Sequence, residues 1–274
     1  MNIPKRLQQL LPLILIVVIA LYAVFNFLVR PRSSTLPGNA RTDGTCGNQF
    51  AFGKPSYSGP DHTQAVCHGA FAALSSLDKK VPLYSAEHIV GRNTVGSETR
   101  TNDFRPDETL PPGQRAEIKD YLRSGYDRGH MSPAADFKKE PKKMSESFYL
   151  SNMVPQNHVL NAEAWAGLES ATRDCARTLG EVYVVSGPIF TGRFKTIGPN
   201  KVAVPDAVYK IVVDPKGSSR AFVFANKPAS KQQNYLDRAV SIESVERQTG
   251  LTFFPQGGVD KKGSGQLCTR EFSS

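Results

Sequence analysis

The chain opens with an apolar stretch that follows a short polar tail. Leu11 to Val29 contains no charged residue. A helix of this length, at about 1.5 Å per residue, spans roughly 28 Å, close to the hydrocarbon thickness of a bilayer. The stretch is longer than the apolar part of a typical signal peptide, and no convincing cleavage site follows it. We therefore expect residues 1–10 to be a tail and residues 11–29 to be a transmembrane signal anchor, with a cleaved signal peptide as the alternative.

The pattern changes after the apolar stretch. Residues 30–45 are rich in Pro, Gly, Ser and Thr and show no hydrophobic periodicity, which is typical of a linker. Residues 46–274 then alternate apolar and polar segments, and a chain of about 230 residues can bury a full core as one domain. We expect that domain to carry the function.

Within the domain, short runs of β-branched and aromatic residues predict strands, and a 3.6-residue period predicts helices. Residues 91–112 are polar and predict a loop. Ser241 is a candidate N-cap and Gly250 a candidate stop for the last helix. The predicted strands are 81–90, 182–186, 202–204, 209–213 and 221–224, and the predicted helices are 112–121 and 241–248.

One short segment, Asp127-Arg128-Gly129-His130-Met131, combines residues that suit phosphodiester chemistry. An imidazole titrates near neutrality and can take a proton from water, so His130 is a candidate general base. The planar guanidinium of Arg128 matches phosphate oxygens. Mg²⁺ often takes only one or two protein ligands, and the side-chain oxygen of Asn161 can be such a ligand. Together these residues predict metal-assisted hydrolysis of a phosphodiester.

The spacing predicts a strand–strand–helix unit around these side chains. His130 falls near the end of a short strand, residues 148–152 are the expected second strand, and a helix opens near Asn161. Asn161, Trp165 and Glu169 follow each other at intervals of four, so a helix presents them within one broad face. Trp165 would then anchor the helix in the core, and Glu169 would hold a metal-bound water.

Three motifs in order carry a resemblance to a known family. They are Asp127-Arg128-Gly129-His130, Ser151-Asn152-Met153-Val154-Pro155-Gln156, and the segment from Leu160-Asn161 through Trp165 to Leu168-Glu169. This arrangement resembles the DNA/RNA non-specific endonucleases, the ββα-metal nucleases, and the similarity extends over roughly residues 80–255. The resemblance implies an α+β fold, with a central, mainly antiparallel sheet flanked by helices. It also implies Mg²⁺-dependent cleavage of DNA and RNA with little sequence preference, with Mn²⁺ as a possible substitute.

The resemblance also implies roles for individual residues. His130 would be the general base, Arg128 would stabilise the phosphate charge, Asn161 would bind Mg²⁺ directly, and Glu169 would act on the metal through water. Asn152 would position either His130 or the substrate.

Family members carry a further arginine upstream of these motifs. Arg100 and Arg105 both lie in the corresponding segment, and we favour Arg100, with an ordinary solvated arginine as the alternative for either. His158 lies close to Asn161 in the sequence and is expected at the surface, where the helix begins.

All four cysteines follow the apolar stretch, and none forms a Cys-x-x-Cys pair. An even number after an export-like segment favours two disulfides in an oxidising compartment. Three pairings are possible, and we expect Cys46–Cys67 and Cys175–Cys268. A zinc site built from Cys46, Cys67, His62 and His68, or free buried thiols, are the alternatives.

The anchor and the cysteines together place the domain outside the cytoplasm, in the periplasm or the extracellular space, or secreted if the anchor is cleaved. A net charge of +9 favours encounter with polyanions. The sequence therefore favours a membrane-anchored nuclease that acts on DNA and RNA, and a homodimer is possible. The alternatives are a nucleic-acid-binding or uptake module with little turnover, and a phosphodiesterase for small or lipid substrates.

Overall fold

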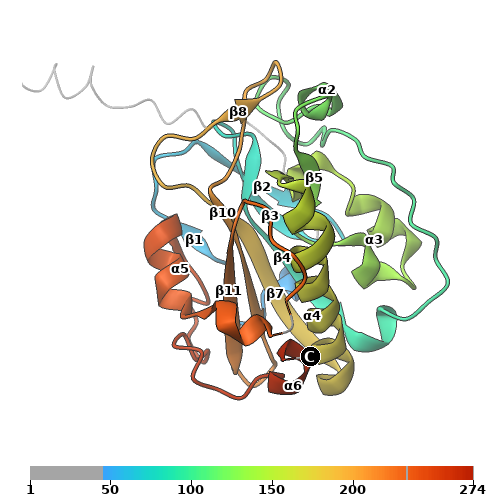
Figure 1. The fold of residues 1–274 in the computed structure, drawn as a ribbon, viewed down its shortest axis with the longest axis vertical. Helices are drawn as coiled ribbons and strands as arrows, with labels where there is room; N and C mark the ends of the chain where they lie inside the picture. Colours follow the sequence, from blue (N-terminus) through green and yellow to red (C-terminus); the bar gives the residue numbers. More distant parts are fainter. Residues whose placement is uncertain (1–45, 233, 274) are drawn as a thin grey trace, which may run out of the picture. The chain divides into compact units, whose positions relative to one another are not determined.

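Seven antiparallel strands form the central sheet, in the order β12-β11-β10-β7-β4-β3-β2 (Figure 1). The computed structural model describes residues 46–232 and 234–273. Residues 1–45, which include the expected tail, anchor and linker, lie outside the described residues. Among the residues that are described, no helix is long and apolar enough to cross a membrane.

The described residues form the following strands and α-helices, in chain order. The strands are β1 Ser56–Tyr57, β2 Thr63–Cys67, β3 Ala72–Ser76, β4 Val81–Val90, β5 Asp127–His130, β6 Met153–Gln156, β7 Glu181–Ile189, β8 Thr196–Ile197, β9 Val202–Ala203, β10 Ala207–Val213, β11 Ser219–Ala225, β12 Ala239–Val240 and β13 Leu251–Thr252. The α-helices are α2 Ile118–Tyr121, α3 Pro141–Glu146, α4 Ala166–Leu179, α5 Ile242–Thr249 and α6 Thr269–Phe272. A π-helical turn, Leu160–Trp165, leads into α4.

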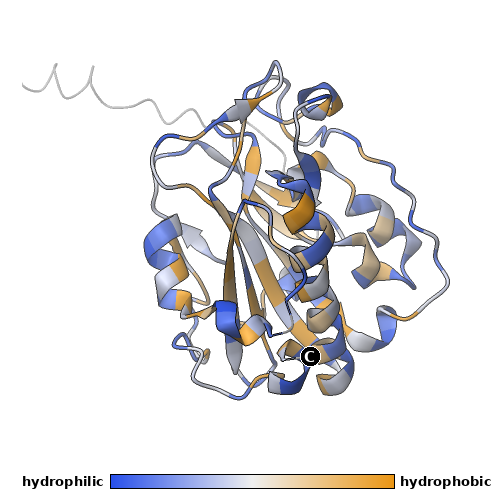
Figure 2. Cartoon of the chain, viewed as in Figure 1, coloured by the Kyte–Doolittle hydropathy of each residue, from blue (hydrophilic) through white to orange (hydrophobic). Residues whose placement is uncertain are grey.

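The period of two along each strand divides the apolar side chains between two layers. In β10, Val208 and Val212 belong to the core that contains the apolar face of α4, whereas Tyr209, Ile211 and Val213 belong to the core that contains residues of α5. Figure 2 shows hydrophobic residues concentrated on the sheet and on the helix surfaces that face it. The sheet is therefore covered on both faces, as the α+β prediction required.

The long strands and the last helix agree with their sequence patterns. The predicted strand 81–90 is β4, and the helix predicted at 241–248 is α5. The Ser241 side chain accepts a hydrogen bond from Ser244 N, and Gly250 ends the helix with a φ of 70°. A left-handed residue at this position is what glycine allows at the smallest cost.

Two predicted elements were wrong in extent. The helix expected at 112–121 contains only α2, because Glu117 and Asp120 form a capping box that starts the helix late. The second strand expected at 148–152 is instead a turn that ends in the 3₁₀ segment Leu150–Asn152, and the strand β6 follows it. Backbone hydrogen bonds at Leu150 and Asn152 go to Arg105 and Tyr149 rather than to a neighbouring strand.

The structure contains both expected disulfides, Cys46–Cys67 and Cys175–Cys268. The zinc alternative does not apply, because its two cysteines are bonded to each other. Cys175 lies in α4 and Cys268 immediately precedes α6, so the second disulfide joins the C-terminal segment to the helix behind the predicted site.

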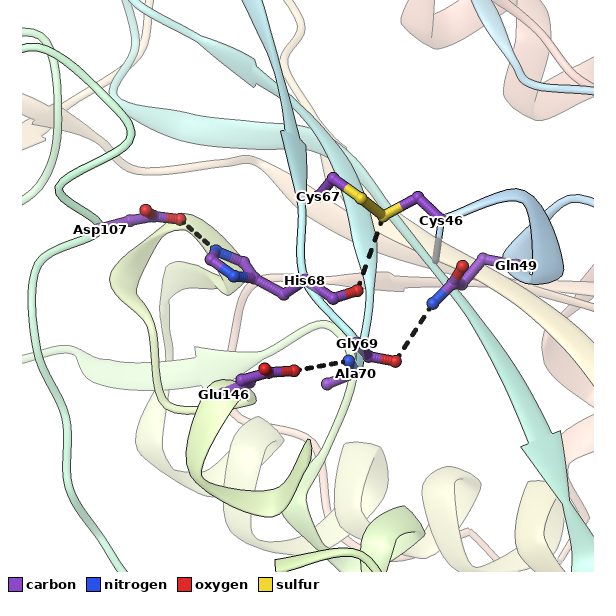
Figure 3. The surroundings of a disulfide bond; sticks show 8 residues. All are labelled: Cys46, Gln49, Cys67, His68, Gly69, Ala70, Asp107 and Glu146. Carbon is purple, nitrogen blue, oxygen red and sulfur yellow. Dashed lines mark hydrogen bonds and ion pairs between the residues drawn. A yellow bond between two sulfur atoms is a disulfide. The ribbon is translucent and has the colours of Figure 1, made fainter. Parts of the chain in front are cut away.

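The first disulfide lies beside a hydrogen-bonded histidine. Figure 3 shows His68, the residue after Cys67, with its ring directed at Asp107. The distance from His68 Nε2 to Asp107 Oδ2 is 2.7 Å. Asp107 also accepts hydrogen bonds from Thr109 and from the Ser151 hydroxyl. The pKa of Asp107 is lowered to about 2, because these hydrogen bonds and the nearby His68 outweigh the opposing effect of burial, which is the largest single contribution. This cluster fixes the end of the 91–107 segment against the residues that precede β6.

We expect the two disulfides to stabilise the fold unequally. Their sequence separations are 93 residues for Cys175–Cys268 and 21 for Cys46–Cys67. Loop-closure entropy then predicts losses of about 5 and about 3 kcal/mol in the free energy of unfolding when each pair is replaced by alanines. Guanidinium titration of the two double variants measures both losses. A larger loss for the pair with the shorter loop would contradict the entropic account.

Candidate active site

The side chains of the predicted site gather around the two-stranded ribbon of β5 and β6. His130 pairs with Met153 in this antiparallel ribbon, and Gly129 pairs with Val154. A Cβ atom at Gly129 would collide with the side chain of the buried Gln156, so this position needs glycine. The backbone carbonyl of His130 accepts a hydrogen bond of 3.2 Å from Trp165 Nε1. The ribbon and the helix that follows it are thus joined at the predicted base.

His130 is buried, with 6% of its surface exposed. Its ring lies against Phe104 and Phe148, with ring centres 5.6 and 5.1 Å away. Burial lowers the pKa of His130 to about 3, and the positive charges of Arg100 and Arg128 act in the same direction. The imidazole is therefore neutral over the physiological pH range and can accept a proton.

Asn152 is fully buried, and its amide is saturated with hydrogen bonds. The oxygen accepts from the Ser132 backbone N–H and from the Ser85 hydroxyl, and the nitrogen donates to the carbonyls of Ser132 and Ser147. The backbone carbonyl of Asn152 also accepts from Met131 N. These contacts fix the chain immediately after His130. Of the two roles expected for Asn152, the geometry favours positioning His130 over contacting a substrate.

Asn161 lies at the edge of the cleft, with its amide held in one orientation. Its Nδ2 donates a hydrogen bond of 2.8 Å to Asp127 Oδ2. The same carboxylate oxygen lies 2.9 Å from Nδ1 of the exposed His158. Asp127 therefore turns the nitrogen of Asn161 toward β5 and leaves the side-chain oxygen as the free ligand atom. Asp127 pairs with these two residues and not with its neighbour Arg128.

The helix that carries Asn161 departs from the expected geometry. Asn161 and Trp165 lie in a π-helical turn, and only Glu169 lies in the regular α-helix. The cap is Asn157, whose side chain accepts from the backbone N–H groups of Val159 and Leu160. Asp127 and His130 of β5 hold Asn161 and Trp165, so both ends of the wide turn are tied to one strand. Such turns occur often at functional sites.

A cleft of about 310 Å³ opens beside this strand, and its lining includes Arg100, Phe104, Asp127, Arg128 and Asn161. The Arg128 guanidinium lies 4.0 Å from the centre of the Phe104 ring. Within the described residues it has no carboxylate partner, so its donors can bind an anion.

The two candidate upstream arginines occupy different surroundings. Arg100 lines the cleft and lies 4.9 Å from the centre of the Phe148 ring. Arg105 instead donates to Asp103 and to the carbonyl of Ser145, and it stacks on Tyr149. The structure therefore brings Arg100, and not Arg105, to the other site residues.

A cluster of charged residues is buried beneath the site. Lys210 donates 2.8 Å to the Ser186 hydroxyl and lies 4.9 Å from the centre of the Trp165 ring. Arg173 pairs with the buried Asp136 at 3.0 Å. The buried carboxyl of Glu87 in β4 interacts with Asp136 through its charge and through a side-chain hydrogen bond.

Burial raises the pKa of the acids in this cluster. The pKa of Glu87 rises well above its usual value through burial and through the negative charge of Asp136, against the opposing effect of Lys210. Burial also raises the pKa of Glu169 to about 7, while Lys210 and Arg173 lower it. The cluster thus contains three carboxyls (Glu87, Asp136 and Glu169) but only two cations (Lys210 and Arg173). The fold therefore favours the protonated form of Glu87, whose pKa is raised most clearly by burial.

Sequence reasoning missed three contributors to this site. Phe104 stacks on Arg128, Asp127 orients Asn161, and Lys210 lies beneath Trp165. Asp127 could have been found from the sequence, because it is the first residue of the Asp127–Met131 segment that predicts the site. A lysine inside an apolar strand, such as Lys210, is a second usable signal, because lysine is almost never fully buried without a partner.

Comparisons with known proteins identify the family of the chain. A family model described as DNA/RNA non-specific endonuclease matches residues 48–259. The chain belongs to the DNA/RNA non-specific endonuclease family. The matched range covers β5, β6 and α4, which carry the candidate site.

Several relatives are identical to the chain at about a third or more of the aligned positions. The mitochondrial nuclease EXOG of Danio rerio is 38% identical over 207 residues, covering 69% of this chain and 60% of the relative. Mitochondrial endonuclease G of Bos taurus is 36% identical over 214 residues, covering 73% and 72%. The mitochondrial nuclease 1 of Schizosaccharomyces pombe is 34% identical, covering 80% and 73%. The chain spans about three fifths of the length of the EXOG nucleases that it matches.

A solved structure of an EndoG/EndoGI complex, described as showing the mechanism of EndoG inhibition, contains a chain with the same fold. Its TM-score is 0.72 at 32% sequence identity, and the match covers 81% of this chain and 97% of that one. The mixed fold with its antiparallel sheet is therefore shared.

Glu87→Gln tests the buried cluster. Below the pKa of an unfolded glutamate, near 4.3, the folded and unfolded chains both hold the proton. Above it the unfolded chain releases the proton and the fold keeps it, so the wild type loses up to about 1.4 kcal/mol of stability per pH unit. Glutamine has no such loss. We expect the stability of the variant, relative to wild type, to increase from pH 5 to pH 8.

Thermal unfolding at several pH values measures this difference. Glu108→Gln, at an exposed glutamate, is the control for the loss of one negative charge. A gain at Glu87 that is the same at pH 5 and pH 8 would show that the carboxyl does not keep its proton in the fold.

Proposed function

We propose that this protein is a metal-dependent endonuclease that hydrolyses phosphodiester bonds of DNA and RNA with little sequence preference. The observation that carries the proposal is the cleft, in which Arg100, Arg128 and the oriented Asn161 lie beside the strand that ends in His130. Membership of the non-specific endonuclease family supports it.

His130 is proposed as the general base. Its imidazole is neutral and held by aromatic rings, and its backbone is fixed by Trp165 and, through Ser132, by Asn152. It takes a proton from the water that attacks phosphorus. The low pKa limits its basicity in the free protein, and the negative charge of a bound phosphate raises that pKa toward a useful value.

Arg128 and Arg100 are proposed to bind the reacting phosphate. Neither has a carboxylate hydrogen-bond partner in the described part of the chain. Arg100 donates only to Asn102 Oδ1, at 2.7 Å. Guanidinium groups that already face the cleft stabilise the growing negative charge of the transition state with little reorganisation.

The residues present fit a Mg²⁺ or Mn²⁺ ion. Asn161 would hold the ion through its side-chain oxygen, and Glu169 would hold one of its waters. Mg²⁺ often takes only one or two protein ligands and leaves its other positions to water and phosphate. Such an ion, when bound, stabilises the charge on the phosphate and the leaving oxygen.

Low sequence preference follows if most contacts go to phosphates and sugars, which carry no direct sequence information. The arginines of the cleft are suited to such contacts. The excess of basic residues supports a polymeric anion as substrate over a small or lipid phosphodiester.

We also propose that the domain works in an oxidising compartment, outside the cytoplasm, with residues 11–29 as its membrane anchor. The two disulfides support the compartment. The relatives named above are mitochondrial nucleases, and fractionation of cells that express the full chain distinguishes a mitochondrial location from a cell-surface one.

His130→Ala tests the nuclease and its base together. The purified, oxidised full chain is incubated with supercoiled plasmid or with total RNA, with Mg²⁺ or with EDTA. We expect metal-dependent degradation of both substrates, and a loss of about 10²- to 10⁴-fold in the variant, the range typical of a general base. His62→Ala, at an exposed histidine that pairs with Asp78, is the matched control and should keep its activity. No cleavage by the folded wild type with any divalent ion would favour the binding-module alternative.

The acid side of the pH–rate profile tests the electrostatics around His130. The pKa of His130 is lowered, so its protonated and inactive form accumulates only in strong acid, and the limb of kcat/KM that His130 produces should lie well below pH 6.5. Arg100→Gln removes a positive charge that lowers this pKa. In that variant the pKa rises, so the acid limb of kcat/KM should move to higher pH. An unchanged or lower limb in Arg100→Gln would refute the assignment of His130 as the base.

A further inference from the structure

The candidate cleft continues beyond the residues assigned so far. It is also lined by Ile118, Tyr121, Leu122, Arg123 and Tyr126, which belong to α2 and to the turn before β5. Figure 1 shows α2 at the end of the molecule where β5 and the start of α4 lie. The proposed reaction uses none of these side chains.

Leu122 is the most exposed large apolar residue of the described chain, with 68% of its surface accessible. Ile118 and Tyr126 on either side of it pack against the main core. The turn therefore has apolar neighbours that could have covered Leu122, yet it directs this side chain to the cleft. A leucine at the edge of a polar cleft provides a surface for a flat, partly apolar group.

Arg123 adds a free positive charge next to Leu122. It is exposed, and within the described residues its guanidinium has no hydrogen bond or ion pair. Its backbone has a φ of 55°, in the left-handed region that non-glycine residues adopt at a cost of about 1 kcal/mol or more. The strained position is held by an arginine where a glycine would be more favourable.

The hydroxyl of Tyr121 also lacks a partner. Tyr121 lines the cleft, and its hydroxyl oxygen is buried and forms no hydrogen bond with the described residues. Buried hydroxyls are usually paired, so an unpaired one in a cleft is available to a ligand.

The turn that carries these groups is rigid. Asp120 is fully buried, and its carboxylate accepts hydrogen bonds from Glu117 N and from the backbone and side-chain nitrogens of Asn200. The β8–β9 segment therefore holds α2 in place through Asn200. Groups on a fixed turn bind a ligand at a smaller entropic cost than groups on a mobile loop.

The geometry points to a subsite for the nucleotide next to the scissile phosphate. In this subsite Leu122 packs on the nucleobase, Arg123 binds the neighbouring phosphate, and the Tyr121 hydroxyl donates to an oxygen of the nucleotide. The inference rests on the proposed function, because it takes the occupant to be a nucleic-acid strand continuous with the reacting phosphate. Base packing and phosphate pairing require no particular sequence, which matches low preference.

Binding of a fluorescent single-stranded 16-nucleotide DNA, measured by anisotropy in the His130→Ala background of the full chain, tests the subsite. Arg123→Gly suits the left-handed backbone, so it should fold as stably as its parent. We expect it to weaken binding by about 5- to 20-fold at low salt and to reduce the slope of log K against log salt by about 0.7, the value for one lost phosphate contact on a single strand. Leu122→Ser should weaken binding by about 3- to 10-fold without changing this slope. Tyr121→Phe should weaken it by about 2- to 5-fold.

Two variants control for charge and apolar surface elsewhere. Arg247→Ala removes an exposed positive charge from α5, on the opposite layer of the sheet, and Leu179→Ser removes an exposed leucine from the end of α4. Effects at Arg123 and Leu122 that do not exceed those of the controls would overturn the subsite, and so would the absence of any binding to DNA. The binding assay needs no turnover, so the two proposals can fail separately. If the wild-type chain never cleaves nucleic acid but DNA binding still depends on Arg123 and Leu122, the nuclease is refuted and the subsite is kept.

Discussion

The amide of Asn152 is the contact on which the geometry of the site depends. It is buried in the middle of the molecule and binds the backbone on both sides of Ser132, two residues after His130. Its other two hydrogen bonds reach Ser147 and Ser85, so three separate segments meet at one side chain. A shorter or apolar residue here would leave several buried polar groups unpaired, each costing about 1–3 kcal/mol. The position of the imidazole is therefore set by the core and not by the cleft.

Near Asn152, the cleft and the interior beneath it differ in the sign of their excess charge. The arginines of the cleft have no carboxylate partners among the described residues, whereas the interior beneath contains more carboxyls than cations. Lys210 lies between these two regions and contacts Trp165 as well as the carbonyl of Met131. Its positive charge limits the rise in the pKa of Glu169. Positive potential is thus concentrated where a phosphate would bind.

Much of the site could be predicted from the sequence, because its chemistry depends on residue types at fixed intervals. The strand that carries His130, the helix that follows Asn161 and the α5 helix with its Ser241 cap were all readable from local patterns. The second strand of the ribbon was predicted at 148–152, a few residues before its actual position. Residues 148–152 are buried as part of a turn, and strand pairing begins only at β6. The sequence could not decide between the two roles expected for Asn152, positioning His130 or positioning the substrate. The hydrogen bonds that favour the first role include one to Ser85, which is far away along the chain. Phe104 was missed for the same reason, because its contacts with Arg128 and His130 join segments that are apart along the chain.

The π-helical turn before α4 has a consequence for how this helix can vary. In an α-helix each residue turns the chain by about 100°, so side chains eight positions apart drift by about 80° around the axis. The wider turn takes up part of that drift and brings Asn161 closer to the same line as Glu169. Removing one residue between them would give a more regular helix, yet it would rotate every later side chain away from the cleft and pull Cys175 out of alignment with Cys268. The irregular turn therefore sets the rotational phase of the whole helix, and the helix tolerates changes of residue type there far better than changes of length.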